Sequence, residues 1–283
     1  MAVILKGAPA AKALNEQTAQ RVARLRACGV QPKLAILRVG ERQDDVAYEN
    51  AAVKRCAALE IDVERVLLPE SCTQAELLAA IDALNADETV HGVLMFRPLP
   101  GHLNEAEACE RLSPKKDVDG ITSGSMAEVY SGAGTGFAPC TAQAVLELLR
   151  HYAVPLSGRR VTVIGRSLVI GRPAAMLLMR ENATVTLCHS KTERLPDITG
   201  EADIVVAALG KAETIGAEYL RPGQIVVDVG IHYSEAGQCL VGDVDFRAAE
   251  QIVDALTPVP GGVGSLTTAI LASHVVEAAE QAE

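Results

Sequence analysis

The sequence predicts an α/β fold of two lobes with a cleft between them. Apolar strand-like and helix-like segments alternate in each half of the chain, which is typical of parallel sheets. Hydrophobic residues make up 49 % of the chain but aromatic residues only 3 %, so the core is built from aliphatic side chains, as in sheets buried on both faces. A length of 283 residues suffices for two domains of ordinary size.

The first half of the chain reads as a βαβαβ unit. Strands are expected at residues 33–40, 62–68 and 92–96, and helices at 44–59 and from Thr73 onward. Glu76 stands three residues after Thr73, which indicates a capping box at the start of the second helix. Because strands joined by helical crossovers pair in parallel, we expect a parallel sheet in this half.

The second half repeats this alternation after a Gly- and Ser-rich stretch at residues 123–138, which predicts a loop or domain joint. The expected strands are 160–165, 184–188, 204–209 and 224–229, and the expected helices are 141–152, 173–181 and 265–280. We therefore expect a first domain of residues 1–138, completed by a C-terminal helix within 265–283. The second domain is expected to span residues 139–264.

Composition and charge exclude several classes of protein. A net charge of −10 argues against a nucleic acid or an anionic membrane as the main partner. The seven cysteines are odd in number and widely spaced, without a CxxC pair, which favours reduced thiols over disulfides or a metal site. The chain shows neither a signal peptide nor a transmembrane stretch. We therefore expect a cytoplasmic protein that holds no metal.

The segment from Gly165 to Pro173 joins a buried strand to a helix, where a Rossmann-type domain binds phosphates. Gly165 permits a tight turn, Gly171 permits close approach of the backbone, and Pro173 suits a first helical turn. Amides at the start of the helix would then face a pyrophosphate. The alternative is an ordinary βα turn, since the usual GxGxxG pattern is absent.

The residues after the second strand of this domain favour NADP over NAD. An NAD site usually places an acidic residue there to bind the ribose hydroxyls. This chain has His189, Ser190, Lys191 and Thr192 instead. Ser190 and Arg166 would donate hydrogen bonds to a 2′-phosphate, which a carboxylate would repel. The alternative is that the basic residues are solvated surface charges.

Around these residues the chain resembles the methylenetetrahydrofolate dehydrogenase/cyclohydrolase family. The resemblance spans nearly the whole chain through long motifs in the family's order. In the first half they are residues 39–40, 48, 98–100, 116–120 and 139–141. In the second half they are residues 165–173, 183–186, 188–192, 202–206, 227–230, 242–245 and 257–264.

The resemblance implies an enzyme of one-carbon folate metabolism that forms a homodimer. The family oxidises 5,10-methylenetetrahydrofolate to the methenyl form with NADP and hydrolyses that product to 10-formyltetrahydrofolate. The catalytic residues implied are Tyr48 and Asp119, and the substrate-binding residues are Tyr48, Asp119, Pro98, Leu99 and Gly262. The cofactor-binding residues implied are Gly165, Arg166, Ser167, Gly171, Pro173, His189, Ser190, Lys191, Thr192, Gly210, Gly230 and Ile231.

The chain departs from the family at the residues that serve hydrolysis. The family's catalytic Lys, four residues after Tyr48, is Ala52, and the Gln before its Pro-Leu-Pro triplet is Phe96. Lys54 lies about 200° round the helix from Ala52 and so faces away, although a local gap in the alignment would bring it into register. The other replacements are Ser125, Ala127, Ala142 and Ser265, where the family has Asn, Gly, Pro and Pro.

These departures predict a dehydrogenase whose cyclohydrolase step is weak or absent. Hydride removal from the methylene carbon moves no proton and depends on orientation. Hydrolysis requires proton transfers, and a positioned acid/base group typically contributes about 10²–10⁴-fold. Two alternatives remain open: a fully bifunctional enzyme that uses Lys54 or Arg97, and a catalytically silent protein that binds folate or dinucleotide.

Overall fold

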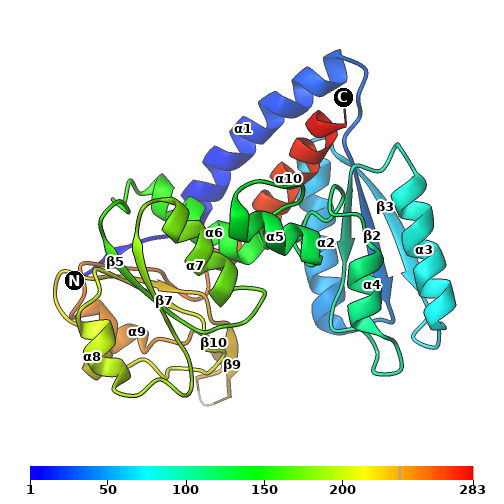
Figure 1. The fold of residues 1–283 in the computed structure, drawn as a ribbon. Helices are drawn as coiled ribbons and strands as arrows, with labels where there is room; N and C mark the ends of the chain where they lie inside the picture. The colour runs from blue at the N-terminus through cyan, green and yellow to red at the C-terminus, as the bar shows by residue number, and fades with distance from the viewer. Residues whose placement is uncertain (236, 283) are drawn as a thin grey trace. The chain divides into compact units, whose positions relative to one another are not determined.

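The computed structural model describes residues 1–235 and 237–282, which form two compact units (Figure 1). Unit 1 consists of Met1–Lys12 and Thr141–Thr267, and unit 2 of Ala13–Cys140 and Thr268–Glu283. The first twelve residues therefore lie with the second half of the chain, which corrects their expected place in a domain of residues 1–138. The reason is that β1 (Val3–Ile4) pairs in parallel with β11 (Ala255–Leu256).

Unit 2 is built on a three-stranded parallel sheet in the order β3-β2-β4. Its strands are β2 (Lys33–Val39), β3 (Asp62–Leu68) and β4 (Gly92–Met95). Leu34 of β2 is in register with Val63 of β3 and with Gly92 of β4. The parallel sheet expected for the first half is thus confirmed, because each strand is followed by a helix that carries the chain back to the same end.

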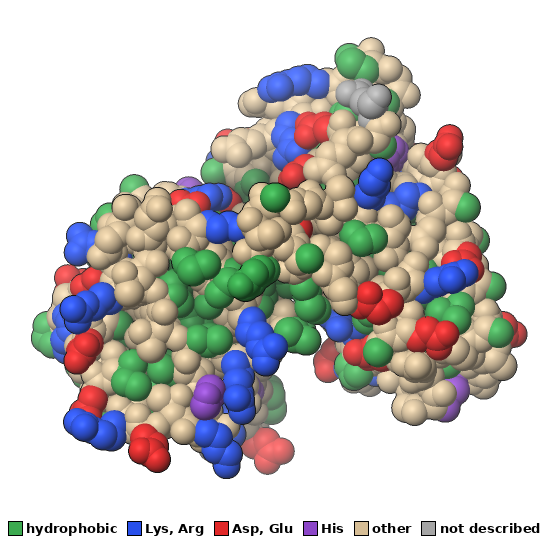
Figure 2. Space-filling model, viewed as in Figure 1, with side chains coloured by type: hydrophobic (Ala, Val, Ile, Leu, Met, Phe, Trp, Pro, Cys, Tyr) green, Lys and Arg blue, Asp and Glu red, His purple; other side chains and the backbone are tan. Residues whose placement is uncertain are grey.

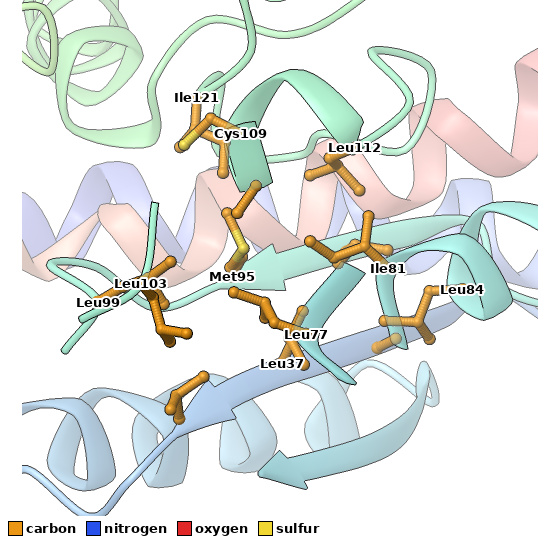
Figure 3. Close-up of a cluster of buried hydrophobic side chains, with 14 of the residues drawn as sticks. Leu37, Leu77, Ile81, Leu84, Met95, Leu99, Leu103, Cys109, Leu112 and Ile121 are labelled. Atoms are coloured by element: carbon orange, nitrogen blue, oxygen red, sulfur yellow. The ribbon is translucent and has the colours of Figure 1, made fainter. Parts of the chain in front are cut away.

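The helices α3 (Gln74–Ala86) and α4 (Glu105–Arg111) supply apolar side chains to a core cluster shared with this sheet (Figure 3). The expected capping box is present: the Glu76 amide donates to the Thr73 hydroxyl, and the Thr73 amide donates to the Glu76 carboxylate. The labelled members of the cluster are Leu37, Leu77, Ile81, Leu84, Met95, Leu99, Leu103, Cys109, Leu112 and Ile121.

The remaining helices of unit 2 are α1 (Gly7–Ala27), which begins in unit 1, α2 (Gln43–Ala58), α5 (Ser123–Ser131) and α10 (Thr267–Gln281). The helix α5 corrects the loop expected at residues 123–138: the Thr122 hydroxyl accepts from the Ser125 amide, and Gly132 ends the helix at φ 72°. Within unit 2, α10 lies beside α1, where Arg21 pairs with Glu280 at 2.6 Å (Figure 1).

Unit 1 contains a six-stranded parallel sheet in the order β1-β11-β8-β7-β5-β6. Its other strands are β5 (Arg160–Ile164), β6 (Thr184–Cys188), β7 (Ile204–Ala207) and β8 (Ile225–Asp228). The helices are α6 (Cys140–His151), α7 (Gly171–Arg180), α8 (Leu195–Gly200) and α9 (Phe246–Glu250), with 3₁₀ turns η1 (Ala217–Tyr219) and η2 (Val263–Ser265). A hairpin of β9 (His232–Ser234) and β10 (Cys239–Val241) forms a separate two-stranded sheet.

Most expected strands and helices agree with these bounds to within two residues. The closing helix begins at Thr267 rather than at 265, because residues 263–265 form the 3₁₀ turn η2. The helix α1, the hairpin and the short helices α8 and α9 were not predicted. Across residues 1–235 and 237–282, no helix combines the length and apolarity that crossing a membrane requires.

Candidate functional site

The loop between β5 and α7 has a backbone path that only glycine permits at two positions. Gly165 has φ +133°, and a Cβ there would collide with the carbonyl oxygen of Ala208. A Cβ on Gly171 would collide with the carbonyl oxygen of Gly165. The loop therefore folds back tightly on the start of α7, against the residue that follows β7.

One hydroxyl group fixes the far side of this loop. The Ser167 Oγ accepts hydrogen bonds from the amides of Ile170, at 3.1 Å, and Gly171, at 3.4 Å. Pro173 is buried in the first turn of α7, where its missing N–H costs no hydrogen bond. The amino terminus of this ten-residue helix is thus held beside the loop, as anion binding at a helix start requires.

A cavity of about 560 Å³ lies next to the loop within unit 1. Its walls come from the loop, from the residues after β6 and from the segments after β7: Ile164, Gly165, Arg166, Ser167, His189, Ser190, Thr192, Leu195, Pro196, Ala208, Leu209, Lys211, Thr214 and Tyr219. Arg166 and Ser190 line the same cavity, whose described walls include two cations and no carboxylate. Lys and Arg side chains gather beside a His on the face of unit 1 seen in Figure 2, although the chain is acidic overall. The cavity therefore fits a dinucleotide with a 2′-phosphate.

Other predicted cofactor residues lie beside this cavity. The amide of Lys191 donates to His189 Nδ1 at 3.1 Å, and the amide of His189 donates to the Thr192 hydroxyl at 2.9 Å. Gly210 lies between two residues of the cavity wall, Leu209 and Lys211, and its own surface is exposed. The turn after β6 is thus held by its own side chains.

A second cavity of unit 1, of about 260 Å³, brings together Gly230, Ile231 and Gly262. Its remaining walls are Asp228, Val229, Pro258, Val259, Pro260, Gly261, Val263, Gly264 and Ser265. Gly262, predicted as a substrate-binding residue, therefore lies in the same unit as two predicted cofactor residues. These walls are mostly backbone and small side chains, which suits a flat ring that needs close approach.

Asp243 was not predicted as a site residue, although residues 242–245 form one of the motifs that resemble the family. This fully buried carboxylate accepts hydrogen bonds from the amides of Leu209 at 2.5 Å, Gly210 at 3.1 Å and Lys211 at 2.9 Å. It thereby holds a wall of the larger cavity. A local sequence pattern could not predict this role, because the amides that donate to Asp243 lie more than thirty residues away in the chain.

In unit 2, the position expected for an acid/base group is apolar. Tyr48 on α2 meets Phe96, which follows β4, with ring centroids 6.1 Å apart and an edge-on angle of 82°. Ala52, one turn after Tyr48, is 0 % exposed and Phe96 is 9 % exposed. Lys54 is exposed, as its position on the helix predicts. Neither Ala52 nor Phe96 carries a group that transfers protons.

Asp119 lies in a loop that runs beside β4, where Asp117 bridges to Val93. The Cys140 amide donates to Asp119 Oδ1 at 3.3 Å. Burial raises the pKa of the Asp119 carboxyl, while hydrogen bonds from Cys140 and, more weakly, the positive charge of Arg97 oppose this in part. The Asp117 carboxylate accepts from the amides of Ile121 and Thr122, which fixes the course of the loop.

Two further predicted residues follow Phe96 directly. Pro98 is exposed and its carbonyl accepts from Arg42 at 3.1 Å, whereas Leu99 is buried in the core cluster. The Leu99 amide donates to Glu105 at 2.8 Å, so the start of α4 fixes this turn. Tyr48, Phe96 and the Pro-Leu-Pro turn therefore belong to one region of unit 2.

Comparison with known proteins gives matches to two domains. Residues 5–119 match the tetrahydrofolate dehydrogenase/cyclohydrolase catalytic domain, and residues 139–283 match the NAD(P)-binding domain of the same name. The bifunctional protein FolD of Carboxydothermus hydrogenoformans is 50 % identical over 283 residues, covering 99 % of this chain and 98 % of the relative.

Solved structures show the same similarity. The bifunctional FolD enzyme of Campylobacter jejuni is 36 % identical with a TM-score of 0.95, and 99 % of each chain is covered. The Trypanosoma brucei methylenetetrahydrofolate dehydrogenase-cyclohydrolase, solved with NADP and an inhibitor, is 35 % identical with a TM-score of 0.91. That match covers 99 % of this chain and 98 % of the other.

Proposed function

Because the chain belongs to the tetrahydrofolate dehydrogenase/cyclohydrolase family, we propose that it is a dehydrogenase of this family whose cyclohydrolase step is weak or absent. Its reaction is the NADP-dependent oxidation of 5,10-methylenetetrahydrofolate to 5,10-methenyltetrahydrofolate. The observation that carries the proposal is the apolar pair at the family's acid/base position, Ala52 and Phe96, beside Tyr48.

In this proposal unit 1 binds the cofactor. Arg166 and Ser190 donate to the 2′-phosphate, and the loop Gly165–Gly171 with the start of α7 presents amides to the pyrophosphate. Gly230, Ile231 and Gly262 form a wall that a planar ring approaches closely. Bound at these residues, NADP would supply the hydride acceptor for the oxidation of the methylene carbon.

Unit 2 binds and orients the folate. The Asp119 carboxylate accepts two hydrogen bonds from the amino-pyrimidinone edge of the pterin, and Tyr48 packs against the folate. Pro98 and Leu99 shape the adjoining turn, which Glu105 holds through the Leu99 amide. These residues orient the reacting carbon and move no proton, so the loss of the family's Lys leaves hydride transfer intact.

Hydrolysis of the methenyl product requires proton transfers that these residues do not supply. A methyl group at position 52 and a phenyl ring at position 96 neither donate nor accept a proton. The nearest lysine in sequence, Lys54, is exposed on another side of α2. Without a positioned acid/base group, a factor of about 10²–10⁴ in rate is missing.

A coupled absorbance assay with NADP and NAD in parallel tests the proposal. We expect NADPH to form from methylenetetrahydrofolate, while methenyltetrahydrofolate is hydrolysed at or near its uncatalysed rate. Formation of 10-formyltetrahydrofolate well above that rate would instead establish a bifunctional enzyme that uses substitute residues. Absence of NADPH with properly folded protein would establish a silent folate- or dinucleotide-binding protein.

We also propose a cytoplasmic homodimer that pairs through unit 1. The strand β6 is the outer strand of the six-stranded sheet, and Leu187 on it is 37 % exposed. An exposed edge strand presents unpaired backbone N–H and C=O groups that can pair with another chain. All seven cysteines are unpaired thiols, as in a reducing compartment. Sedimentation velocity should give twice the monomer mass, and Leu187→Lys should shift it toward the monomer.

A further inference from the structure

Asp243 collects hydrogen bonds from two separate segments of unit 1. Its Oδ2 atom accepts from the amides of Leu209 and Gly210, and its Oδ1 atom accepts from the Lys211 amide at 2.9 Å. Oδ1 also lies 2.8 Å from His232 Nε2. Of these four described donors, three are backbone amides and one is a side chain, that of His232.

One segment lines the larger cavity described above, and the other directly follows residues that line the smaller cavity. Leu209 and Lys211 line the cavity of about 560 Å³. His232 begins the β9–β10 hairpin directly after Gly230 and Ile231, which line the cavity of about 260 Å³. The Asp243 carboxylate therefore ties one wall of the larger cavity to one wall of the smaller.

A second buried carboxylate fixes the position of Asp243 itself. Asp228, at the end of β8, accepts from the Asp243 amide at 3.0 Å, the Val244 amide at 2.9 Å and the Gly230 amide at 3.0 Å. The Asp228 amide in turn donates to Thr257 Oγ1 at 2.7 Å. Since these bonds anchor the backbone of Asp243, its carboxylate is a fixed point from which the two cavity walls are held.

We propose that His232 is a positioning residue for NADP, acting through Asp243 on the segment Leu209–Lys211. An Nε2–H group donates to the carboxylate whether the imidazole is neutral or protonated. Removing that donor leaves a fully buried carboxylate with fewer partners, which disturbs the amides held by the same oxygens. The cofactor wall then loosens, while the folate-binding residues of unit 2 keep their positions. The inference rests on the proposed cofactor site.

Three variants test this role. His232→Leu removes the donor, His232→Gln places an amide N–H near the position of Nε2, and Tyr233→Leu is the control, since Tyr233 lies on the same strand and is 65 % exposed. The readouts are hydrogen exchange of the 209–211 amides without cofactor, NADP affinity by calorimetry, and KM for each substrate. Thermal unfolding checks folding, and His232→Ala replaces His232→Leu if that variant fails to fold.

We expect His232→Leu to speed exchange at residues 209–211 and to raise the Kd and KM for NADP about tenfold, the usual order for a lost hydrogen bond to a charged group. The KM for methylenetetrahydrofolate should change much less. His232→Gln should restore most of the affinity, and Tyr233→Leu should match the wild type.

Unchanged NADP affinity in His232→Leu, an equal rise in both KM values, or the same loss in Tyr233→Leu would each overturn the inference. The proposed function fails separately. Wild-type protein that binds NADP but forms no NADPH would refute the dehydrogenase, while exchange and calorimetry would still decide the role of His232.

Discussion

The candidate sites of the two units are built from different materials. In unit 1 the cavity walls are held by backbone amides that a glycine loop, the Ser167 hydroxyl and the Asp243 carboxylate fix in place. In unit 2, the proposed loss of hydrolysis rests on two single side chains, Ala52 and Phe96. A change at such a position removes proton transfer while the helix and the sheet persist, so a reaction step in unit 2 is lost more easily than cofactor binding in unit 1.

Restoring the lost side chains is the strongest test of this contrast. Ala52→Lys combined with Phe96→Gln should raise methenyltetrahydrofolate hydrolysis by about 10²-fold or more, since a positioned acid/base group contributes about 10²–10⁴-fold. Ala52→Lys alone should gain less, because an ammonium group beside Phe96 would be poorly solvated and poorly oriented. Absorbance assays that follow the loss of methenyltetrahydrofolate measure hydrolysis by both variants. No gain in a folded double variant would place the missing chemistry elsewhere.

In unit 1 the backbone itself should be the sensitive part. Gly171→Ala places a Cβ against the Gly165 carbonyl, so the loop must move. Because this movement misplaces several charge-assisted hydrogen bonds to the phosphates at once, the affinity for NADP should fall about a hundredfold. Gly200→Ala is the matched control, because a Cβ there meets no atom within 4 Å. Calorimetric titration with NADP measures both variants. Equal affinity in the two would contradict a backbone-built site.

Two buried groups, one in each unit, should also respond in opposite directions to acid. Burial lowers the pKa of His274 in unit 2 to about 4, so its contribution to stability is present above pH 6.5 and is lost as the pH falls through 4. Burial raises the pKa of Asp228 in unit 1 to about 6, so its contribution is present below pH 3.8 and is lost as the pH rises through 6. Each is worth on the order of 3 kcal/mol.

Urea unfolding between pH 4 and 7 separates these two titrations. Relative to wild type, His274→Gln should lose less stability on acidification and Asp228→Asn should lose more. His151→Gln, a change at an exposed histidine, should leave the pH dependence as it is. If the pH dependence of the unfolding free energy shifts in the same direction for His274→Gln and Asp228→Asn, the opposite linkage of these two groups is contradicted.

The smallest effect concerns one exposed side chain of unit 1. Arg166→Ala should weaken NADP about tenfold, as expected for a charge-assisted bond at an exposed site, and should change NAD affinity less than twofold. Parallel titrations with the two dinucleotides measure the difference. Equal losses for both would show that Arg166 does not contact the 2′-phosphate.

Local patterns predicted those elements whose stability is local. The strands β2 and β5 were placed to within one residue, because apolar runs bounded by polar or glycine residues are typical of buried strands. The helix α5 was missed because Gly and Ser residues favour loops. The Thr122 cap and the Gly132 ending stabilise it, together with the burial of Val129. The helix α1 was not predicted, and part of its stability comes from distant partners on α10.

The same limit applies to the site. Arg166 and Ser190 could be predicted because a strand, a turn and a helix follow one another in the chain, and both line one cavity. The role of Asp243 could not be predicted from the sequence, since its hydrogen-bond partners include Leu209, which lies 34 residues away in the chain. Tyr48 and Phe96 were known as separate motif positions, whereas the edge-on contact between their rings is a property of the folded unit alone.

The order in which the chain visits the two units affects how the protein folds during synthesis on the ribosome. The chain passes between the units three times, after Lys12, Cys140 and Thr267. Strand β1 is synthesised first, but its partner β11 is synthesised near the end of the chain. Likewise, Arg21 can pair with Glu280 only after 259 more residues have been added. Since synthesis proceeds at about 5–20 residues per second, both units stay incomplete for roughly 10 to 50 seconds. Chaperones that shield exposed apolar surface should therefore bind nascent chains of this protein until α10 has emerged.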